Sequence, residues 1–509
     1  MVLKIAGITK RFGALTANED VSLTLHQGDV VALLGENGAG KTTLMNILFG
    51  HYVADEGEIL VAGETGALEH LPPGSPQAAL DAGIGMVHQH FTLAENLTGF
   101  ENILLGVESI FGLARGRSAA RAKVEKIITD SGLGVDLDTP VSSLTVGEKQ
   151  RVEILKALFR DARILVLDEP TAVLTPQESE GLFQVVEKLA AAGLTVIFIS
   201  HKLHEVLAAS HRIAVLRGGA LVGELNTEDA DRGKIAELMV GREVPASQRA
   251  PMSPGDIVLQ LDQVHVGGSD ARRTLHAVSM QVHEREVVGI AGVAGNGQTA
   301  LASLISGLVE PEAGRVEFCG TEVTTFSPRT FMSAGIGRIP EDRHHDGVVG
   351  AMTVAENLAI ETLKDDRFSS NGFLRFQGFQ THAQEAIDAF DIRCSGPDAS
   401  ARLLSGGNMQ KLILARVLEN EPKLILANQP TRGLDVGAQT EVHRRLLAAR
   451  ERDAAVILIS EDLDELFTLT DRIYVIHAGH LDDAGPTEAL DRAAVGLMMA
   501  GHSPEAKAS

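Results

Sequence analysis

The chain repeats itself at a fixed offset, and this repeat constrains its fold more than any other feature. Residues 144–151 read Leu-Thr-Val-Gly-Glu-Lys-Gln-Arg, and residues 404–411 read Leu-Ser-Gly-Gly-Asn-Met-Gln-Lys, so the offset is 404 − 144 = 260. Residues 164–171 and 424–431 keep the same spacing. A repeat of this length has the size of a whole domain, which predicts two copies of one domain in the 509-residue chain.

A glycine-rich segment near the start of each half extends the repeat. Residues 35–42 read Gly-Glu-Asn-Gly-Ala-Gly-Lys-Thr and residues 292–299 read Gly-Val-Ala-Gly-Asn-Gly-Gln-Thr. Their offset, 292 − 35 = 257, fits a small change in loop length. Prolines and polar residues after residue 241 are typical of a short linker. The predicted layout is domain 1 at 1–240, a linker at 241–256, domain 2 at 257–500 and a tail at 501–509.

Short apolar runs alternate with helical stretches in each half. Residues 30–34, 164–167 and 195–199 are almost continuously apolar and too short for helices that span a domain. Runs of this kind are typical of parallel strands that are buried on both faces. The pattern predicts an α/β fold with a parallel or mixed core sheet.

The charge balance limits the classes of partner. The chain has 68 Asp and Glu against 45 Lys and Arg, a formal net charge of −23, so its overall field does not favour binding to nucleic acid or anionic lipid. No run reaches the roughly 18 apolar residues that a membrane span needs. Cys319 and Cys394 lack the spacing of metal ligands and are expected to be free thiols.

Residues 35–42, the first phosphate loop, carry the strongest local signal. They lie between the predicted strand 30–34 and a helical run, and they fit the pattern Gly-x-x-x-x-Gly-Lys-Thr. Glycines allow backbone N–H groups to surround phosphate oxygens, Lys41 reaches the β and γ phosphates, and Thr42 offers a hydroxyl to Mg²⁺. The alternative is a strand-turn-helix glycine loop without a ligand.

Two carboxylates follow the predicted strand 164–167. Asp168 is placed to hold Mg²⁺ directly or through water, and Glu169 is placed to orient and deprotonate an attacking water. An Asp-Glu-Pro turn can also be a simple helix cap. A phosphate loop in the same half favours the metal site, because such a loop needs a strand-end acidic partner for its metal.

Residues 404–410 resemble the signature loop of the ATP-binding cassette (ABC) ATPases, and residues 144–150 resemble a weakened copy. With the phosphate loops and the strand-end residues, the resemblance covers nearly all of both halves. It implies two tandem ABC-type P-loop ATPase domains, each with a core sheet and a helical subdomain, packed head to tail. It also implies ATP and Mg²⁺ as ligands.

The resemblance implies one complete site, shared between the phosphate loop of domain 1 and the signature loop of domain 2. Phe12 matches the aromatic that stacks on adenine, Gln89 the glutamine at Mg²⁺, and His201 the switch histidine at the γ-phosphate. The implied catalytic residues are Glu169, His201 and Lys41, and the implied metal ligands are Thr42, Gln89 and Asp168. The implied nucleotide-binding residues are Phe12, Gly35, Glu36, Asn37, Gly38, Ala39, Gly40, Lys41, Thr42, Thr43, Gln89, Ser405, Gly406, Gly407 and Asp435.

The departures from the family pattern all fall in the other, degenerate site. Its implied residues are Gly292, Gly295, Gly297, Gln298, Thr299, Glu341, Asn428, Gln429 and Glu461. Gln298 replaces the lysine, Glu341 the glutamine, Asn428 and Gln429 the two carboxylates, and Glu461 the histidine. Val146 replaces a signature glycine and Thr175 an aspartate. This site is expected to hydrolyse little or no ATP, because a missing general base alone costs about 10²- to 10⁴-fold in rate.

Tandem cassettes with one intact and one weakened site look like the ATP-binding subunits of bacterial importers for simple sugars and nucleosides. Residues 340–343 and 430–438 favour this pattern, and residues 87–91 together with 428–430 favour the nucleoside branch. The resemblance implies two integral-membrane permease subunits, an extracytoplasmic solute-binding protein, a place at the cytoplasmic face of a bacterial membrane, and no nucleic acid. Residues 91–100 and 353–358 occupy the positions that receive the permease in such systems.

A second class stays open, namely a tandem-cassette ATPase that acts on ribosomes or DNA without a permease. Proteins of that class typically keep both sites intact and carry a long basic linker. Between Gly241 and Asp256, Arg242 and Arg249 are the cations of this chain. The sequence does not identify the solute, the transport direction or the number of subunits, because the solute does not touch this chain.

Overall fold

The computed structural model describes residues 1–63, 65–88, 91–106, 116–171, 174, 176–200, 202–241, 249–268, 273–370 and 373–501. The chain divides into two compact units: unit 1 comprises residues 1–245 and 435–437, and unit 2 comprises residues 246–434 and 438–509. Gln89, His201 and Thr175, which the sequence places at the two sites, and Arg242 of the linker lie outside the described residues.

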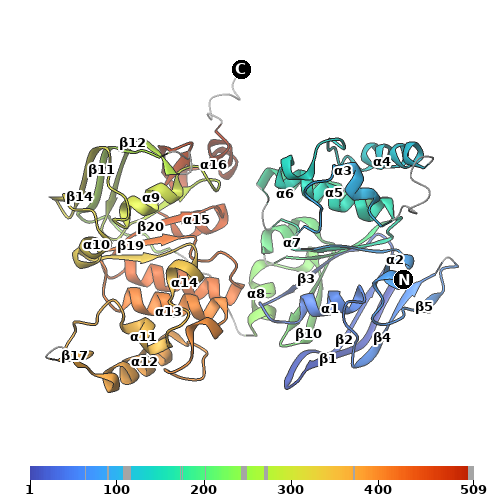
Figure 1. Cartoon of the computed structure of the whole chain (residues 1–509), viewed down its shortest axis with the longest axis horizontal. Helices are drawn as coiled ribbons and strands as arrows, with labels where there is room; N and C mark the ends of the chain where they lie inside the picture. The colour runs from blue at the N-terminus through green and yellow to red at the C-terminus, as the bar shows by residue number, and fades with distance from the viewer. Residues whose placement is uncertain are drawn as a thin grey trace. The chain divides into compact units, whose positions relative to one another are not determined.

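Unit 1 has a six-stranded sheet, in the order β10-β9-β3-β8-β7-β6, and a four-stranded antiparallel sheet, in the order β2-β1-β4-β5 (Figure 1). The strands are β1 (Leu3–Phe12), β2 (Leu15–Leu25), β3 (Val30–Gly35), β4 (Glu56–Ala62), β5 (Leu68–His70), β6 (Ile84–Val87), β7 (Ile164–Asp168), β8 (Thr195–Ile199), β9 (Arg212–Arg217) and β10 (Ala220–Asn226). The helices are α1 (Lys41–Leu48), α2 (Pro76–Asp81), α3 (Gly99–Leu104), α4 (Arg117–Ser131), α5 (Val146–Phe159), α6 (Pro176–Ala191), α7 (Leu203–Ala209) and α8 (Arg232–Val240).

Unit 2 repeats this plan, with a six-stranded sheet in the order β16-β19-β20-β13-β21-β22 and a four-stranded sheet in the order β12-β11-β14-β15. The strands are β11 (Ile257–Val266), β12 (Leu275–His283), β13 (Val287–Ala291), β14 (Ala313–Phe318), β15 (Thr321–Glu322), β16 (Ile336–Ile339), β17 (Ser369–Ser370), β18 (Phe373–Leu374), β19 (Leu424–Asn428), β20 (Ala455–Ser460), β21 (Arg472–His477) and β22 (His480–Pro486). The helices are α9 (Gln298–Ile305), α10 (Pro328–Ala334), α11 (Val354–Ala359), α12 (Phe376–Phe390), α13 (Gly406–Leu418), α14 (Val436–Arg450), α15 (Leu463–Leu469) and α16 (Arg492–Met499).

The predicted α/β class with a mixed core sheet is confirmed. In unit 1, β3 runs parallel to β8 and β9, and β7 runs parallel to β6 and β8, whereas the edge strand β10 is antiparallel to β9. Residues of β3 alternate between two cores, because successive side chains of a strand point to opposite faces. Val30, Ala32 and Leu34 join a core with α5, α6, α7 and α8, whereas Val31 and Leu33 join α1 and the antiparallel sheet.

The phosphate loops and the strand-end residues of each unit lie at one edge of the six-stranded sheet. The first phosphate loop follows β3, Glu169 follows β7, and Ser200 follows β8, which lies between them in the sheet. The carboxyl ends of parallel strands meet at one edge, and this edge is where open α/β sheets bind ligands. Among the described residues, no helix combines the length and the apolar character required to cross a bilayer.

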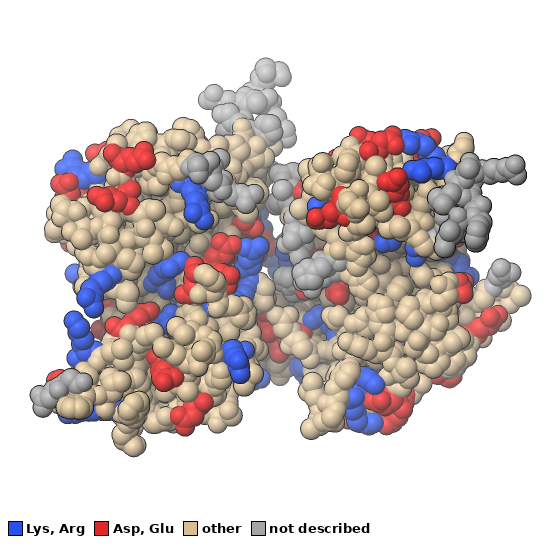
Figure 2. All heavy atoms as spheres, viewed as in Figure 1, with Lys and Arg blue, Asp and Glu red and all other residues tan. Residues whose placement is uncertain are grey.

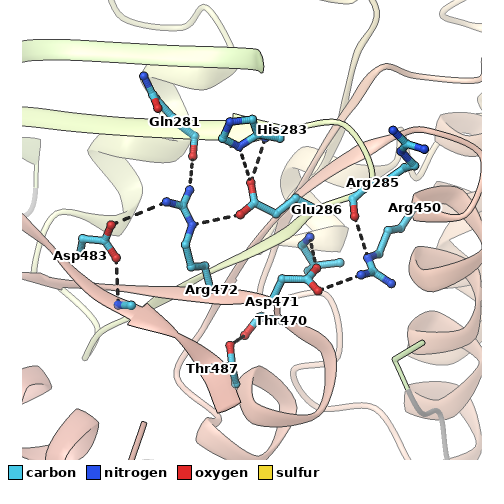
Figure 3. A network of polar contacts seen from close by, with 12 residues as sticks. Gln281, His283, Arg285, Glu286, Arg450, Thr470, Asp471, Arg472, Asp483 and Thr487 are labelled. Carbon is cyan, nitrogen blue, oxygen red and sulfur yellow. Dashed lines mark hydrogen bonds and ion pairs between the residues drawn. The ribbon is translucent and has the colours of Figure 1, made fainter. Parts of the chain in front are cut away.

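A buried arginine in unit 2 joins the end of α14 to the opposite, amino-terminal edge of the sheet (Figure 3). The guanidinium of Arg450, which is 1% exposed, donates to Asp471 Oδ1 at 2.8 Å, to the carbonyl of Arg285 at 3.0 Å and to that of Ala250 at 2.8 Å. The other oxygen of Asp471 accepts from the N–H of Val287 at 2.8 Å. Arg450 therefore fixes the carboxyl end of the linker and the start of β13 together.

Replacing Arg450 with alanine is expected to destabilise unit 2 by about 1 to 3 kcal/mol, because two carbonyls lose their donors. The Asp471 carboxylate also loses one cation but keeps its ion pair with Arg249. Native-state hydrogen exchange of the β13 and β21 amides measures the free energy of opening of unit 2 separately from unit 1. Arg444→Ala on the same helix is the control, because the Arg444 side chain is 54% exposed. It should change the free energy of opening of unit 2 by less than about 0.5 kcal/mol. Equal effects of the two substitutions would show that the buried contacts of Arg450 contribute no net stability.

Candidate nucleotide site

The first phosphate loop has the backbone of an anion cradle. Gly38 and Gly40 adopt left-handed conformations, with φ of 82° and 95°. A Cβ at Gly40 would lie 2.1 Å from the carbonyl oxygen of Ala17, so no larger residue fits there. The loop leads directly into α1, whose first N–H groups lack intrahelical acceptors and suit an anion.

Lys41 lies buried inside this loop. Its Nζ donates to the carbonyls of Gly35 at 2.7 Å and Glu36 at 2.9 Å. Burial lowers the pKa of Lys41, and the nearby carboxylates of Glu169 and Asp168 partly offset that effect. A bound polyphosphate would favour the charged amine further, because an anion in a poorly solvated site stabilises a cation strongly.

Asp168 and Glu169 lie next to each other at the end of β7. Burial, together with the charge of Glu169, raises the pKa of Asp168 to about 6 against the opposing effect of Lys41. Glu169 has φ of 48°, a left-handed conformation that costs about 1 kcal/mol or more for a residue with a Cβ, and its N–H donates to the carbonyl of Ile199 at 3.0 Å. The turn therefore holds the catalytic candidate in a strained position between β7 and β8.

The chemistry of this donor set fits a magnesium ion. The Thr42 hydroxyl is on an exposed residue, and Asp168 is a carboxylate that gains stability from a nearby cation. Hydroxyl and carboxylate oxygens are the protein ligands that Mg²⁺ takes when substrate phosphates and water fill most of its coordination positions. Among the described residues, no group of three or more His, Cys, Asp or Glu could hold a metal ion.

The second phosphate loop keeps the cradle and loses the charges. Gly295 and Gly297 have φ of 92° and 110°, close to the values of Gly38 and Gly40. Gln298, in place of Lys41, is 7% exposed, and its Nε2 has no hydrogen-bond partner among the described residues. The loop backbone thus keeps the conformation of the first phosphate loop, with an amide in place of the ammonium of Lys41.

The end of β19 copies the turn of β7 without its carboxylates. Gln429 has φ of 49°, and its N–H donates to the carbonyl of Ile459 at 2.8 Å, as Glu169 does to Ile199. Asn428 is buried at the position of Asp168. Unit 2 thus carries amides where unit 1 carries carboxylates, in a turn with a similar φ and the same backbone hydrogen bond.

Glu341 takes part in an ion pair at the equivalent of the Gln89 position. It pairs with Arg432, and the adjacent Arg343 donates to the carbonyls of Arg432 and, at 3.3 Å, of Gly406. Burial lowers the pKa of the Arg343 guanidinium, and Asp342 opposes that shift. Residues 341–343 thus contact both the signature loop of unit 2 and the loop before Asp435, so Glu341 contributes to loop packing within unit 2.

The two signature loops begin helices in different ways. Ser405 caps α13, because its hydroxyl accepts from the backbone N–H of Asn408 at 3.5 Å and from the side-chain Nδ2 of the same residue at 2.9 Å. Gly406 and Gly407 form the start of the first turn. Thr145 caps α5 in a capping box, in which the Glu148 carboxylate accepts from the Thr145 N–H at 2.8 Å. An anionic side chain therefore already lies at the helix start in unit 1 and opposes a second anion there.

Glu148 is a charged residue at the signature loop of unit 1 that we did not predict from the sequence. The signal was visible in the sequence, because Thr followed three residues later by Glu is the pattern of a capping box. Asn408 at the matching position is neutral, which leaves the helix dipole of α13 available to a phosphate. Glu148 and Val146 therefore both distinguish the helix start of unit 1 from that of unit 2, where Asn408 and Gly406 occupy these positions.

Phe12 lies on the surface of unit 1 and not in its core. The ring is 44% exposed and packs edge to face on Tyr52, with ring centres 5.6 Å apart. An exposed aromatic at the end of β1 is suited to stacking on a planar ligand. Its contact with adenine stays a prediction, as do the roles of Gln89 and His201.

Comparison with known proteins places this architecture. The sequence profile of the ABC transporter family matches the chain twice, at residues 18–172 and 275–432. The chain belongs to the ABC transporter family. As an ABC transporter ATPase it binds and hydrolyses ATP, and the two matches coincide with the two copies of the phosphate loop and the strand-end turn.

Curated relatives of this ABC transporter ATPase are similar along their full length. The nucleoside import ATP-binding protein NupA of Lactococcus lactis subsp. cremoris is 42% identical over 98% of both chains. The glucose import ATP-binding protein TsgD13 of Haloferax volcanii is 42% identical over 98% of this chain and 96% of its own. The guanosine import ATP-binding protein NupO of Bacillus subtilis is 40% identical over 98% of this chain and 97% of its own.

Among solved structures, the archaeal ribosome recycling factor aABCE1, in complex with the ribosomal stalk protein aP1, is similar to this ABC transporter ATPase over 94% of this chain and 90% of its own. The TM-score is 0.63 and the sequence identity is 19%. At that identity the similarity shows the tandem fold and nothing of the activity.

Proposed function

We propose that this chain energises the import of a solute, with nucleosides as the favoured class and simple sugars as the alternative. The observation that carries the proposal is the contrast between the two copies of one site: Lys41, Asp168 and Glu169 are charged, and their counterparts Gln298, Asn428 and Gln429 are amides. Relatives that are 40–42% identical along the full chain are import ATP-binding proteins.

In the proposed mechanism, domain 1 (1–240) and domain 2 (257–500) divide the work. The backbone of the first phosphate loop and Lys41 bind the β and γ phosphates, and Ser405, Gly406 and Gly407 of the other domain complete the site with Asp435. Glu169 accepts the proton of the attacking water, while His201 contacts the γ-phosphate. Mg²⁺, held by Thr42, Gln89 and Asp168, would neutralise charge on the phosphates when bound.

The second site, in this proposal, hydrolyses little or nothing and serves a structural or regulatory role. Gln429 carries no charge and cannot act as a general base, and Gln298 offers dipoles where Lys41 offers a full charge. The helix start at Thr145 presents the Glu148 carboxylate to any anion. One ATP is therefore hydrolysed per catalytic cycle of each chain.

The proposed partners are two integral-membrane permease subunits, with an extracytoplasmic binding protein, and the proposed location is the cytoplasmic face of the membrane. In each unit the segment assigned to permease contact is held by a buried asparagine. Asn102 donates to the carbonyl of Ala94 at 3.0 Å, and Asn357 donates to that of Val349 at 3.1 Å. Capping boxes at Thr98 and Thr353 fix the same helices, α3 and α11.

On the face shown in Figure 2, acidic and basic side chains of the described residues are interspersed over both units. Such a surface does not concentrate the positive charge on which non-specific binding to nucleic acid depends. The feature favours the importer over an ATPase that acts on ribosomes or DNA.

Deleting the gene for this chain should lower the uptake of radiolabelled purine nucleosides to the background rate, because the permease loses its source of energy. Wild-type protein should restore uptake, and Glu169→Gln protein at equal abundance should not. Ribose and glucose serve as parallel substrates. Loss of sugar uptake alone would assign the sugar class instead, and unchanged uptake of all of them would favour the ribosome or DNA alternative.

A further inference from the structure

The buried carboxylate of Glu205 lies between the two loops that carry the catalytic candidates of unit 1. Thr171, two residues after Glu169, donates its hydroxyl to Glu205 Oε2 at 2.6 Å. Ser200, directly before His201, donates its hydroxyl to the same oxygen at 3.0 Å. The three side chains are 2%, 3% and 4% exposed for Thr171, Ser200 and Glu205, so water does not compete for these bonds.

Lys202 completes this cluster and balances its charge. Its Nζ lies 3.2 Å from Glu205 Oε1 and donates to the carbonyl of Thr171 at 3.3 Å. The N–H of Lys202 donates to the Ser200 hydroxyl at 3.1 Å. One carboxylate and one ammonium therefore fix the ends of both loops relative to each other.

Unit 2 contains a related cluster in its degenerate copy. Glu465 accepts from the Thr431 hydroxyl through Oε1 at 2.7 Å and from the Ser460 hydroxyl through Oε2 at 2.6 Å, so the two loops share the carboxylate but not one oxygen atom. The N–H of Asp462 donates to the Ser460 hydroxyl at 3.1 Å. His443 Nε2, 3.0 Å from Glu465, occupies the role of Lys202. The fold thus builds the cluster whether or not the neighbouring loops keep their catalytic side chains, which provides an internal control.

We infer that Glu205 is a positioning residue for hydrolysis: it couples Thr171, in the loop that follows Glu169, to Ser200 at the end of β8, and so holds Glu169 in place for reaction. The inference rests on the proposed function for the identity of the hydrolytic site. A buried carboxylate contributes little net stability compared with an apolar residue of similar size, because its desolvation offsets its bonds. What it supplies here is a single acceptor atom shared by two loops, and misplacing a catalytic group by about 1 Å costs about 10²-fold in rate.

The variants Glu205→Leu and Glu205→Gln test this role through the separate effects on kcat and KM. Leucine removes the shared acceptor, and we expect kcat for ATP hydrolysis to fall about 10- to 100-fold while KM for ATP changes less than about threefold, because the first phosphate loop is untouched. Glutamine retains one oxygen that can accept both hydroxyls, so it should recover most of kcat. The inference would be overturned if kcat of Glu205→Gln were as low as that of Glu205→Leu, or if kcat were unchanged in both variants.

Ser200→Ala and Ser460→Ala form a matched pair of variants that tests the positioning role of Glu205 even if Glu205→Leu does not fold. Each removes one hydroxyl from an equivalent cluster, so the change in thermal stability should be similar. Ser200→Ala should lower kcat roughly 2- to 10-fold, the value of one hydrogen bond, and Ser460→Ala should leave kcat unchanged. Equal kcat values for the pair contradict the inference. A Glu169→Gln protein that remains fully active would instead contradict the proposed function.

Discussion

Glu169→Gln is expected to lower kcat for ATP hydrolysis about 10²- to 10⁴-fold, the contribution of a general base, while ATP binding persists. The substitution turns the end of β7 into a copy of the end of β19, where Gln429 already has the same left-handed conformation and the same bond to the neighbouring strand. We therefore expect the backbone of the variant to be preserved, so that the fall in kcat measures the loss of the general base and not a change of structure. Steady-state ATPase assays with the permease present measure it.

Gln429→Ala is the control for this substitution. It removes the corresponding side chain from the degenerate site and should leave kcat within about twofold, since no general base is lost. If Gln429→Ala abolishes hydrolysis and Glu169→Gln does not, the two sites have been assigned the wrong way round.

Lys41→Gln is expected to lower both ATP affinity and kcat, with kcat falling about 10²- to 10³-fold, as for the loss of a preorganised donor at developing charge. The buried ammonium contacts the Gly35 and Glu36 carbonyls and is the cation of the first phosphate loop. The glutamine of this variant copies Gln298, which occupies the same place in a loop of nearly the same backbone conformation. Equilibrium binding of a fluorescent ATP analogue and ATPase rates measure the two effects.

The reverse substitution, Gln298→Lys, tests whether a cation alone makes a site hydrolytic. It should not raise ATPase activity, because Asn428 and Gln429 still lack charge. A rise in activity in a Glu169→Gln, Gln298→Lys double variant would mean that the second copy retains a base outside the residues identified above.

The elements that the sequence predicted well are those whose signals are local. The strands at 30–34, 164–167 and 195–199 appear as β3, β7 and β8, because buried parallel strands are apolar without interruption. The phosphate loops and helix starts likewise follow from glycines and caps within a few residues of one another.

The features that the sequence did not reveal depend on residues far apart in the chain. The antiparallel sheet of β1, β2, β4 and β5 was not predicted, since its strands are irregular in register and mix polar with apolar residues. Thr171 donates to Glu205, which is 34 positions away in the sequence, and Arg450 donates to the carbonyl of Ala250, which is 200 positions away. No periodicity encodes such pairs, because they arise only when the sheet brings separate loops together.

We expect one of the two copied sites to hydrolyse ATP. Vanadate trapping of labelled ADP in the assembled transporter, followed by proteolytic cleavage within the linker at 241–256 and counting of the label in each fragment, locates the hydrolytic site. One ADP should be trapped per chain, in the fragment that contains Lys41 and Glu169. Trapped ADP in the fragment that contains Gln298 and Gln429, or in both fragments equally, would show that the sites have been assigned wrongly.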